Sequence, residues 1–91
     1  MPTLRPIKPT ERSAQREHLE QALANGDVTI GQAIKTIRRD WMGIPQKRMA
    51  EIAGISVGTL SSIERDSGNV TVANINRVLR VFGGYLNIRL K

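Results

Sequence analysis

The segment from Gln46 to Arg65 constrains the fold most, because Gly54 divides it into two short runs with helical spacing of apolar residues. A tight turn between two helices needs a residue with positive φ, a conformation that glycine adopts freely. Ala50 is small at the place where the backbone of the second helix must approach the first. We therefore predict two short helices that cross at a steep angle around a tight turn.

The two predicted helices have distinct apolar and polar faces. Ser56 is a suitable N-cap for the second helix, because its hydroxyl can accept from a backbone N–H of the first turn. The apolar residues that would lock the pair onto flanking helices are Met49, Ala53, Ile55, Leu60 and Ile63. The polar face of the second helix carries Thr59, Ser61, Ser62 and Arg65.

The segment before this pair also predicts a helix. Thr29 and Gln32 have the spacing of a capping box, and Gly43 ends the helix. One stripe is expected to be buried, namely Ile30, Ala33, Ile34, Ile37 and Trp41. Arg38 and Arg39 fall in the last turn, where cations are favoured by the helix dipole. Pro45 is expected to be the first residue of the next helix.

Two further helices are expected near the ends of the chain. Residues 1–9 hold three prolines and predict an extended arm, after which Thr10 would cap a helix from Glu11 to Ala24 that stops at Asn25-Gly26. Thr71 would cap a last helix, which Gly83-Gly84 would end. Its apolar face is formed by Ile75, Val78, Leu79 and Phe82.

The C-terminal residues Tyr85–Lys91 alternate strictly between polar and apolar side chains, which is typical of a half-buried strand. This strand has no partner elsewhere in the chain. We therefore expect three parts: an N-terminal arm with an accessory helix (1–28), a helical domain (29–84) and a terminal strand (85–91).

Composition and charge narrow the functional classes. The chain has no cysteine, one histidine (His18, expected at the surface) and no catalytic constellation, so we expect no enzyme activity, metal or cofactor. The chain has no apolar run long enough to span a membrane and no secretory signal, which indicates a cytoplasmic protein.

Residues 1–30 carry four basic and four acidic side chains, so the whole net charge of +6 lies in residues 31–91. This location favours a polyanionic partner, although a basic domain with no nucleic-acid role has the same charge.

The run Gln46-x-x-Met49-Ala50-x-x-Ala53-Gly54-Ile55-Ser56-x-x-Thr59-Leu60-Ser61-x-Ile63-Glu64 resembles the Xre family of lambda-repressor-like regulators. The resemblance covers about residues 30–82. It implies an all-α helix-turn-helix bundle, to which the sequence pattern adds an extra N-terminal helix and a C-terminal β-strand paired across a dimer. It also implies a cytoplasmic, nucleoid-associated repressor that binds double-stranded operator DNA.

The resemblance assigns roles to side chains of the two helices. It places Val57, Gly58, Ser61 and Ser62 toward the bases, behind the N-cap Ser56, and Gln46 and Thr59 toward phosphate. Lys47 and Arg65 are added as phosphate partners on their charge alone. No base-facing residue can make a bidentate base contact, so specificity is expected to depend on water, on DNA shape or on Arg65.

The family binds inverted repeats as a two-fold dimer, and we expect the same here. Two copies of the terminal strand would pair antiparallel across the axis. The dimer residues are then Tyr85, Leu86, Ile88 and Leu90.

Two positions depart from the family pattern. Ile44-Pro45 stands where a Ser or Thr cap is usual, so the first phosphate contact can differ. Ile52 stands where a polar side chain is usual, which is either an ordinary exposed isoleucine or a protein contact.

Three functions remain open within these expectations. The short chain with its terminal Leu-x-Ile-x-Leu resembles HipB-type antitoxins, which repress their own operon and bind a HipA-like kinase toxin. A free-standing phage or chromosomal regulator is the alternative. The third is an interaction module that neutralises a partner protein.

Overall fold

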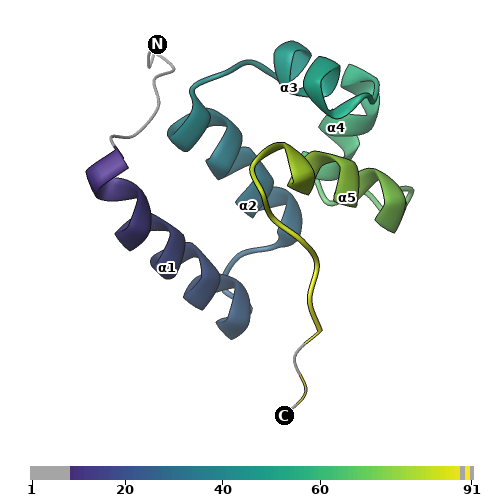
Figure 1. The fold of residues 1–91 in the computed structure, drawn as a ribbon. Helices are drawn as coiled ribbons and strands as arrows, with labels where there is room; N and C mark the ends of the chain where they lie inside the picture. Colours follow the sequence, from purple (N-terminus) through teal and green to yellow (C-terminus); the bar gives the residue numbers. More distant parts are fainter. Residues whose placement is uncertain (1–8, 89, 91) are drawn as a thin grey trace.

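A computed structural model describes residues 9–88 and residue 90 (Figure 1). These residues form five α-helices and one π-helical segment, and none of them is assigned to a strand. The elements are α1 (Pro9–Asn25), α2 (Ile30–Thr36), the π-helical η1 (Ile37–Met42), α3 (Gln46–Ala53), α4 (Val57–Glu64) and α5 (Val72–Val81). No helix in this part of the chain combines the length and the apolar character that crossing a bilayer would require.

The core lies where α2, α3, α4 and α5 meet. Each of these helices contributes one large, fully buried side chain, respectively Ile34, Met49, Leu60 and Val78. Helix α1 lies along the outside of this bundle next to α2 (Figure 1). On α1, the apolar residues Leu19 and Ala22 are half-buried, whereas Ala14 and Leu23 are exposed. The bundle therefore owes its core to α2–α5.

Most of the predicted helix ends are confirmed. Thr29 forms both bonds of the capping box with Gln32, and the hydroxyl of Thr71 accepts from the backbone N–H of Asn74. The left-handed C-cap of η1 is Gly43, with φ +64°. Gly26 and Gly83 follow α1 and α5 with φ +76° at each. Local chemistry thus determines where these helices stop.

Three expectations, one about burial and two about helix starts, are wrong. Ile30, expected in the buried stripe, is 42% exposed, because the first turn of α2 lies at the edge of the bundle. Pro45 is the extended N-cap of α3, so this helix begins at Gln46, one residue later than predicted. Thr10 lies inside α1, which already begins at Pro9.

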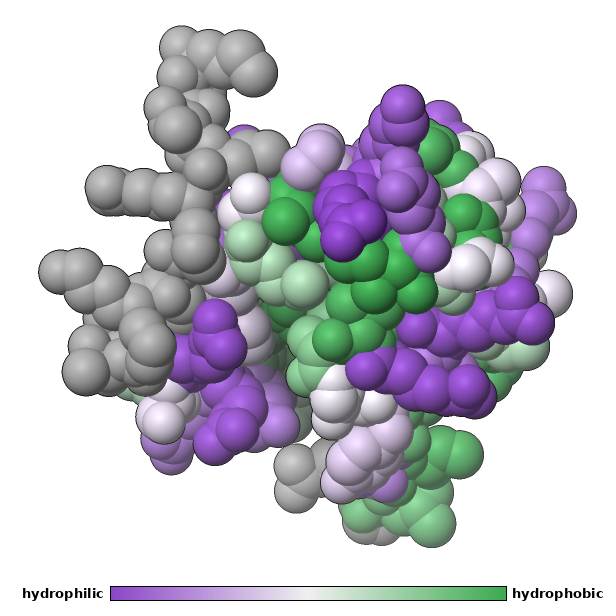
Figure 2. Space-filling view, turned by 45° about the horizontal axis from the view of Figure 1, so that its top comes forward, coloured by the Kyte–Doolittle hydropathy of each residue, from purple (hydrophilic) through white to green (hydrophobic). Residues whose placement is uncertain are grey.

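The C-terminal segment leaves the helical body without regular secondary structure at residues 84–88. The predicted strand is not seen in the single chain, because a strand requires a hydrogen-bonded neighbour. Leu86 packs against the core, but Tyr85, Ile88 and Leu90 are 80%, 85% and 90% exposed. In Figure 2 a lobe projects below the body, and part of its surface is hydrophobic (green). Large apolar side chains are therefore presented to solvent beyond the core.

Candidate nucleic-acid interface

The turn between α3 and α4 has the geometry that the sequence predicts. Gly54 adopts φ +74°, and the backbone N–H of Ile55 donates to the carbonyl of Ala50 over 3.0 Å. A Cβ added to Gly54 would meet no atom within 4 Å, so glycine is needed here for its conformation and not for space. Ala50 is buried between the helices, as expected. The turn and this alanine together hold α3 and α4 as one unit.

The first turn of α4 is held by two hydroxyl groups. The Ser56 hydroxyl accepts from the backbone N–H of Thr59 over 3.0 Å and donates to Thr59 Oγ1 over 2.8 Å. Since Thr59 accepts in this pair, its own hydroxyl hydrogen can donate to an oxygen outside the protein. The N-cap therefore orders Thr59, a side chain that the family resemblance places toward phosphate.

One face of α4 combines the four predicted base-facing residues, because positions 57, 58, 61 and 62 are related by steps of one and four residues. Val57 and Gly58 are exposed, and Ser61 and Ser62 are half-exposed. The nearest atom to a Cβ added at Gly58 would be Ser56 Oγ at 3.9 Å, so packing does not require a glycine. Glycine inside a helix reduces its stability. Its presence here leaves the backbone of α4 open to close approach by another molecule.

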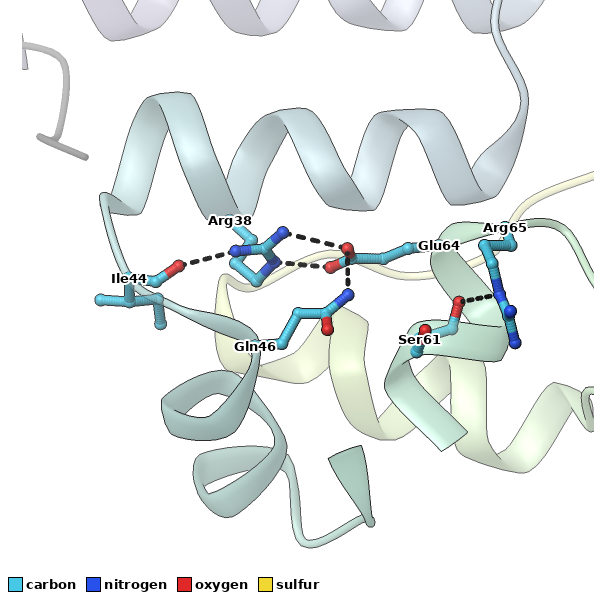
Figure 3. Close-up of polar contacts among 6 residues, drawn as sticks. All are labelled: Arg38, Ile44, Gln46, Ser61, Glu64 and Arg65. Atoms are coloured by element: carbon cyan, nitrogen blue, oxygen red, sulfur yellow. Dashed lines mark hydrogen bonds and ion pairs between the residues drawn. The ribbon is translucent and has the colours of Figure 1, made fainter. Parts of the chain in front are cut away.

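A buried ion pair fixes the far end of α4 (Figure 3). Arg38 of η1 donates from Nε to Glu64 Oε2 over 2.6 Å and from Nη2 to Glu64 Oε1 over 3.0 Å. The same guanidinium donates from Nη1 to the carbonyl of Ile44 over 2.9 Å. The two side chains are only 7% and 3% exposed. This network joins η1, the loop before α3 and the last turn of α4.

Gln46 belongs to the same network. Its Nε2 donates to Glu64 Oε1 over 2.9 Å, and the residue is half-buried (Figure 3). The family resemblance places Gln46 toward phosphate, and the sequence did not reveal this intramolecular bond. An amide nitrogen carries two hydrogens, so one of them remains available after the bond to Glu64. Glu64 therefore orients Gln46 at the start of α3.

The N-terminus of α3 has an unusual charge distribution. Pro45 offers no side-chain cap, and the first turn contains no acidic residue but holds the exposed Lys47 and Arg48. Cations are disfavoured at the positive end of a helix dipole, where an anion is favoured. Arg48, which the sequence analysis did not single out, lies 3.6 Å from Glu51 in an exposed pair of little energetic value. This helix end therefore has no side-chain cap and no acidic residue in its first turn, so it favours an anion from outside the chain.

Arg65 is the last of the predicted DNA-contacting residues. It is exposed at the C-terminal end of α4, and its Nε donates to the carbonyl of Ser61 over 3.3 Å (Figure 3). Arg65 thus lies at the opposite end of α4 from Ser56, and its guanidinium is turned back along its own helix.

A family model described as helix-turn-helix matches residues 34–87 of the chain. The matched region runs from α2 to the C-terminal segment, and it leaves α1 and the first turn of α2 outside. No curated protein and no solved structure matches the chain.

Proposed function

The chain belongs to the Xre-like helix-turn-helix family of DNA-binding regulators, and we propose that it is a sequence-specific repressor that reads operator DNA with α4. One observation carries this proposal. The N-terminal face of α4 is exposed and open at Gly58, while the other end of the same helix is held by a buried ion pair. A rigid helix with an accessible first turn suits insertion into the major groove.

In this binding mode, Val57, Gly58, Ser61 and Ser62 face the base edges. The valine can contact a thymine methyl group, and the serine hydroxyls can donate or accept. None of these side chains can make the bidentate contacts of Arg, Asn or Gln. Specificity therefore depends on close approach of α4, on ordered water and on the shape of the groove.

Phosphate contacts surround this reading face. The N-terminus of α3, with Lys47 and Arg48, would receive a phosphate, because its unpaired N–H groups and dipole favour an anion. Gln46 and Thr59 each retain a hydrogen to donate. Arg65 would contribute its charge from the other end of α4. Such contacts position the protein on DNA without reading its sequence.

Two classes of variant should separate these roles. We expect Lys47→Ala to weaken binding to all DNA sequences alike, because it removes a phosphate contact. The slope of log affinity against log salt should then decrease by about 0.9. Val57→Ala and Ser61→Ala should instead change which sequences are preferred. The measurements are salt titrations on one duplex and selection from a library of random duplexes.

Lys35→Ala is the matched control, because it removes the same charge from an exposed position on α2, outside α3 and α4. Its salt slope should equal that of the parent chain. If the Val57 and Ser61 variants select the same sequence as the parent, α4 is not the reading helix.

The proposed binding unit is a homodimer on an inverted repeat, with half-sites about one helical turn, roughly 34–36 Å, apart. Tyr85, Ile88 and Leu90 support this proposal, because they are exposed apolar residues. Two copies of the segment, paired antiparallel as strands, would satisfy each other's backbone groups and cover these side chains. Leu86, which packs on the core, would anchor each strand to its own body.

Within this family we further propose that the chain is a HipB-type antitoxin that binds a HipA-like kinase. The resemblance of the core and the terminal segment supports this assignment. Helix α1 lies outside the matched residues, and Ile52 is 46% exposed on α3, so surfaces beyond the reading face remain for a second protein. A toxin held on such surfaces could bridge two dimers and strengthen repression.

Pull-down with the protein encoded by the adjacent gene tests this assignment. We expect the full chain to retain that neighbour at micromolar concentration and moderate salt. A shortened chain that begins at Asp27 should retain less of it if α1 takes part. Lack of association with both chains would favour the free-standing regulator.

A further inference from the structure

Asp66 has an unusual backbone conformation directly after α4. Its φ is +58°, and among the described residues no other non-glycine residue has a positive φ. Its N–H donates to the carbonyl of Ile63, and the N–H of Ser67 donates to the carbonyl of Ser62, each over 3.0 Å. This pair of bonds is a Schellman motif, in which glycine usually occupies the left-handed position. An aspartate is therefore held where the backbone alone would favour glycine.

The carboxylate of Asp66 reaches the first turn of α2. Its Oδ1 accepts from the backbone N–H of Gly31 over 2.9 Å, and its Oδ2 accepts from the Thr29 hydroxyl over 2.5 Å. The N-terminal N–H groups of a helix have no partner within the helix, and a negative charge is favoured there. Asp66 thus caps α2 from a position 35 residues further along the chain.

Gly31 allows this contact to be unusually close. A Cβ at this position would lie 2.3 Å from the carbonyl oxygen of Ile63 and 2.7 Å from Asp66 Oδ1. Real Cβ atoms do not approach other atoms so closely, so the backbones of α2 and α4 meet here without an intervening side chain. We call the contact among Thr29, Gly31, Ile63 and Asp66 the α2–α4 clamp.

We propose that Asp66 is a positioning residue for operator recognition, which fixes the orientation of α4 by clamping its C-terminal end to α2. The inference rests on the proposed function, in which the opposite end of α4 meets the bases. Glu64, two residues earlier, joins the same end of α4 to Arg38. Glu64 and Asp66 thus hold the C-terminal end of α4 at two separate points, away from the reading face.

The short side chains of the reading face make this orientation important. Long flexible side chains can adjust to a tilted helix, but a valine, a glycine and two serines cannot. The atoms that contact a partner must be held to within about 0.5 Å by rigid supports. Glycine would adopt the positive φ of Asp66 more easily than aspartate does. A role of the aspartate side chain in recognition explains why aspartate stands there.

The test compares Asp66→Gly with Asp66→Asn. The glycine variant relieves the positive φ and keeps the Schellman bonds, so it is expected to fold, but it lacks the carboxylate. The asparagine variant tolerates the same φ, its Oδ1 can accept from Gly31 N–H, and its amide can donate to the Thr29 hydroxyl. Both variants remove one negative charge. The probes are the duplex that the parent chain selects from a random library and a shuffled duplex of the same composition.

We expect Asp66→Gly to lower the ratio of selected-duplex to shuffled-duplex affinity by about tenfold, the effect of one mismatched base pair. The slope of log affinity against log salt should stay the same. The Asp66→Asn variant should keep the affinity ratio of the parent chain. Asp27→Gly, which removes an exposed carboxylate before α2, should leave the ratio at the parent value.

An unchanged ratio in a folded Asp66→Gly variant would overturn the proposal. Equal weakening on both duplexes, together with loss of helical circular dichroism, would also overturn it, because Asp66 would then only stabilise the fold. A parent chain that prefers no duplex would instead refute the proposed function itself.

Discussion

Removal of residues 85–91 is expected to lower operator affinity by about 10²–10⁴-fold, the usual gain from linking two binding heads. Apart from Leu86, which packs against the core, the large side chains of this segment are almost fully exposed, namely Tyr85, Ile88 and Leu90. The helical body should therefore remain folded while the proposed dimer dissociates. Sedimentation would measure the association state, and binding to the selected duplex would measure the affinity.

Two controls separate dimerisation from folding in this experiment. Removal of residues 87–91 keeps the core contact of Leu86 and should still impair dimerisation. Asn87→Ala changes a residue on the strand face opposite Ile88 and Leu90 and should leave their contacts across the dimer intact. A truncated chain as dimeric as the full one would exclude the segment as the dimer contact.

Glu64→Leu is expected to destabilise the chain by about 3–5 kcal/mol, because it leaves the buried charge of Arg38 without a partner. It also removes the acceptor of Gln46. The double variant Arg38→Met/Glu64→Leu should recover most of this loss, because apolar residues of similar volume commonly replace a buried pair without penalty. Urea unfolding followed by circular dichroism gives the free energies of unfolding.

Glu51→Leu is the matched control for this measurement, since Glu51 lies on the surface in a 3.6 Å pair with Arg48. Exposed pairs contribute about 0–1 kcal/mol, so little change is expected. If Glu64→Leu were as stable as the parent, the ion pair would have no structural importance.

Signals that operate within a few residues were predictable from the sequence. The capping box at Thr29, the N-caps Ser56 and Thr71, and the left-handed Gly54 all depend on neighbours three or four positions away. Their chemistry is the same in any surrounding fold, so residue type and spacing suffice to identify them.

Contacts between distant segments were not predictable. The sequence placed Arg38 in the last turn of a helix but gave no sign of its buried partner, because Glu64 lies 26 residues away. The bond from Gly31 to Asp66 spans 35 residues, and neither residue has a local pattern that indicates it. The π-helical turn of η1 likewise contains ordinary helix-forming residues. The roles of the individual side chains on α4 stay predictions.

The burial of the Arg38–Glu64 pair divides the charges of this protein into two classes that respond differently to ions in the buffer. Mobile ions screen exposed cations such as Lys47 and Arg48 but barely reach a pair with 7% and 3% exposure. Rising ionic strength should therefore release the protein from DNA well before it loosens the fold. Concentrated salt would then elute an intact, correctly assembled reading head, and dilution alone would restore binding.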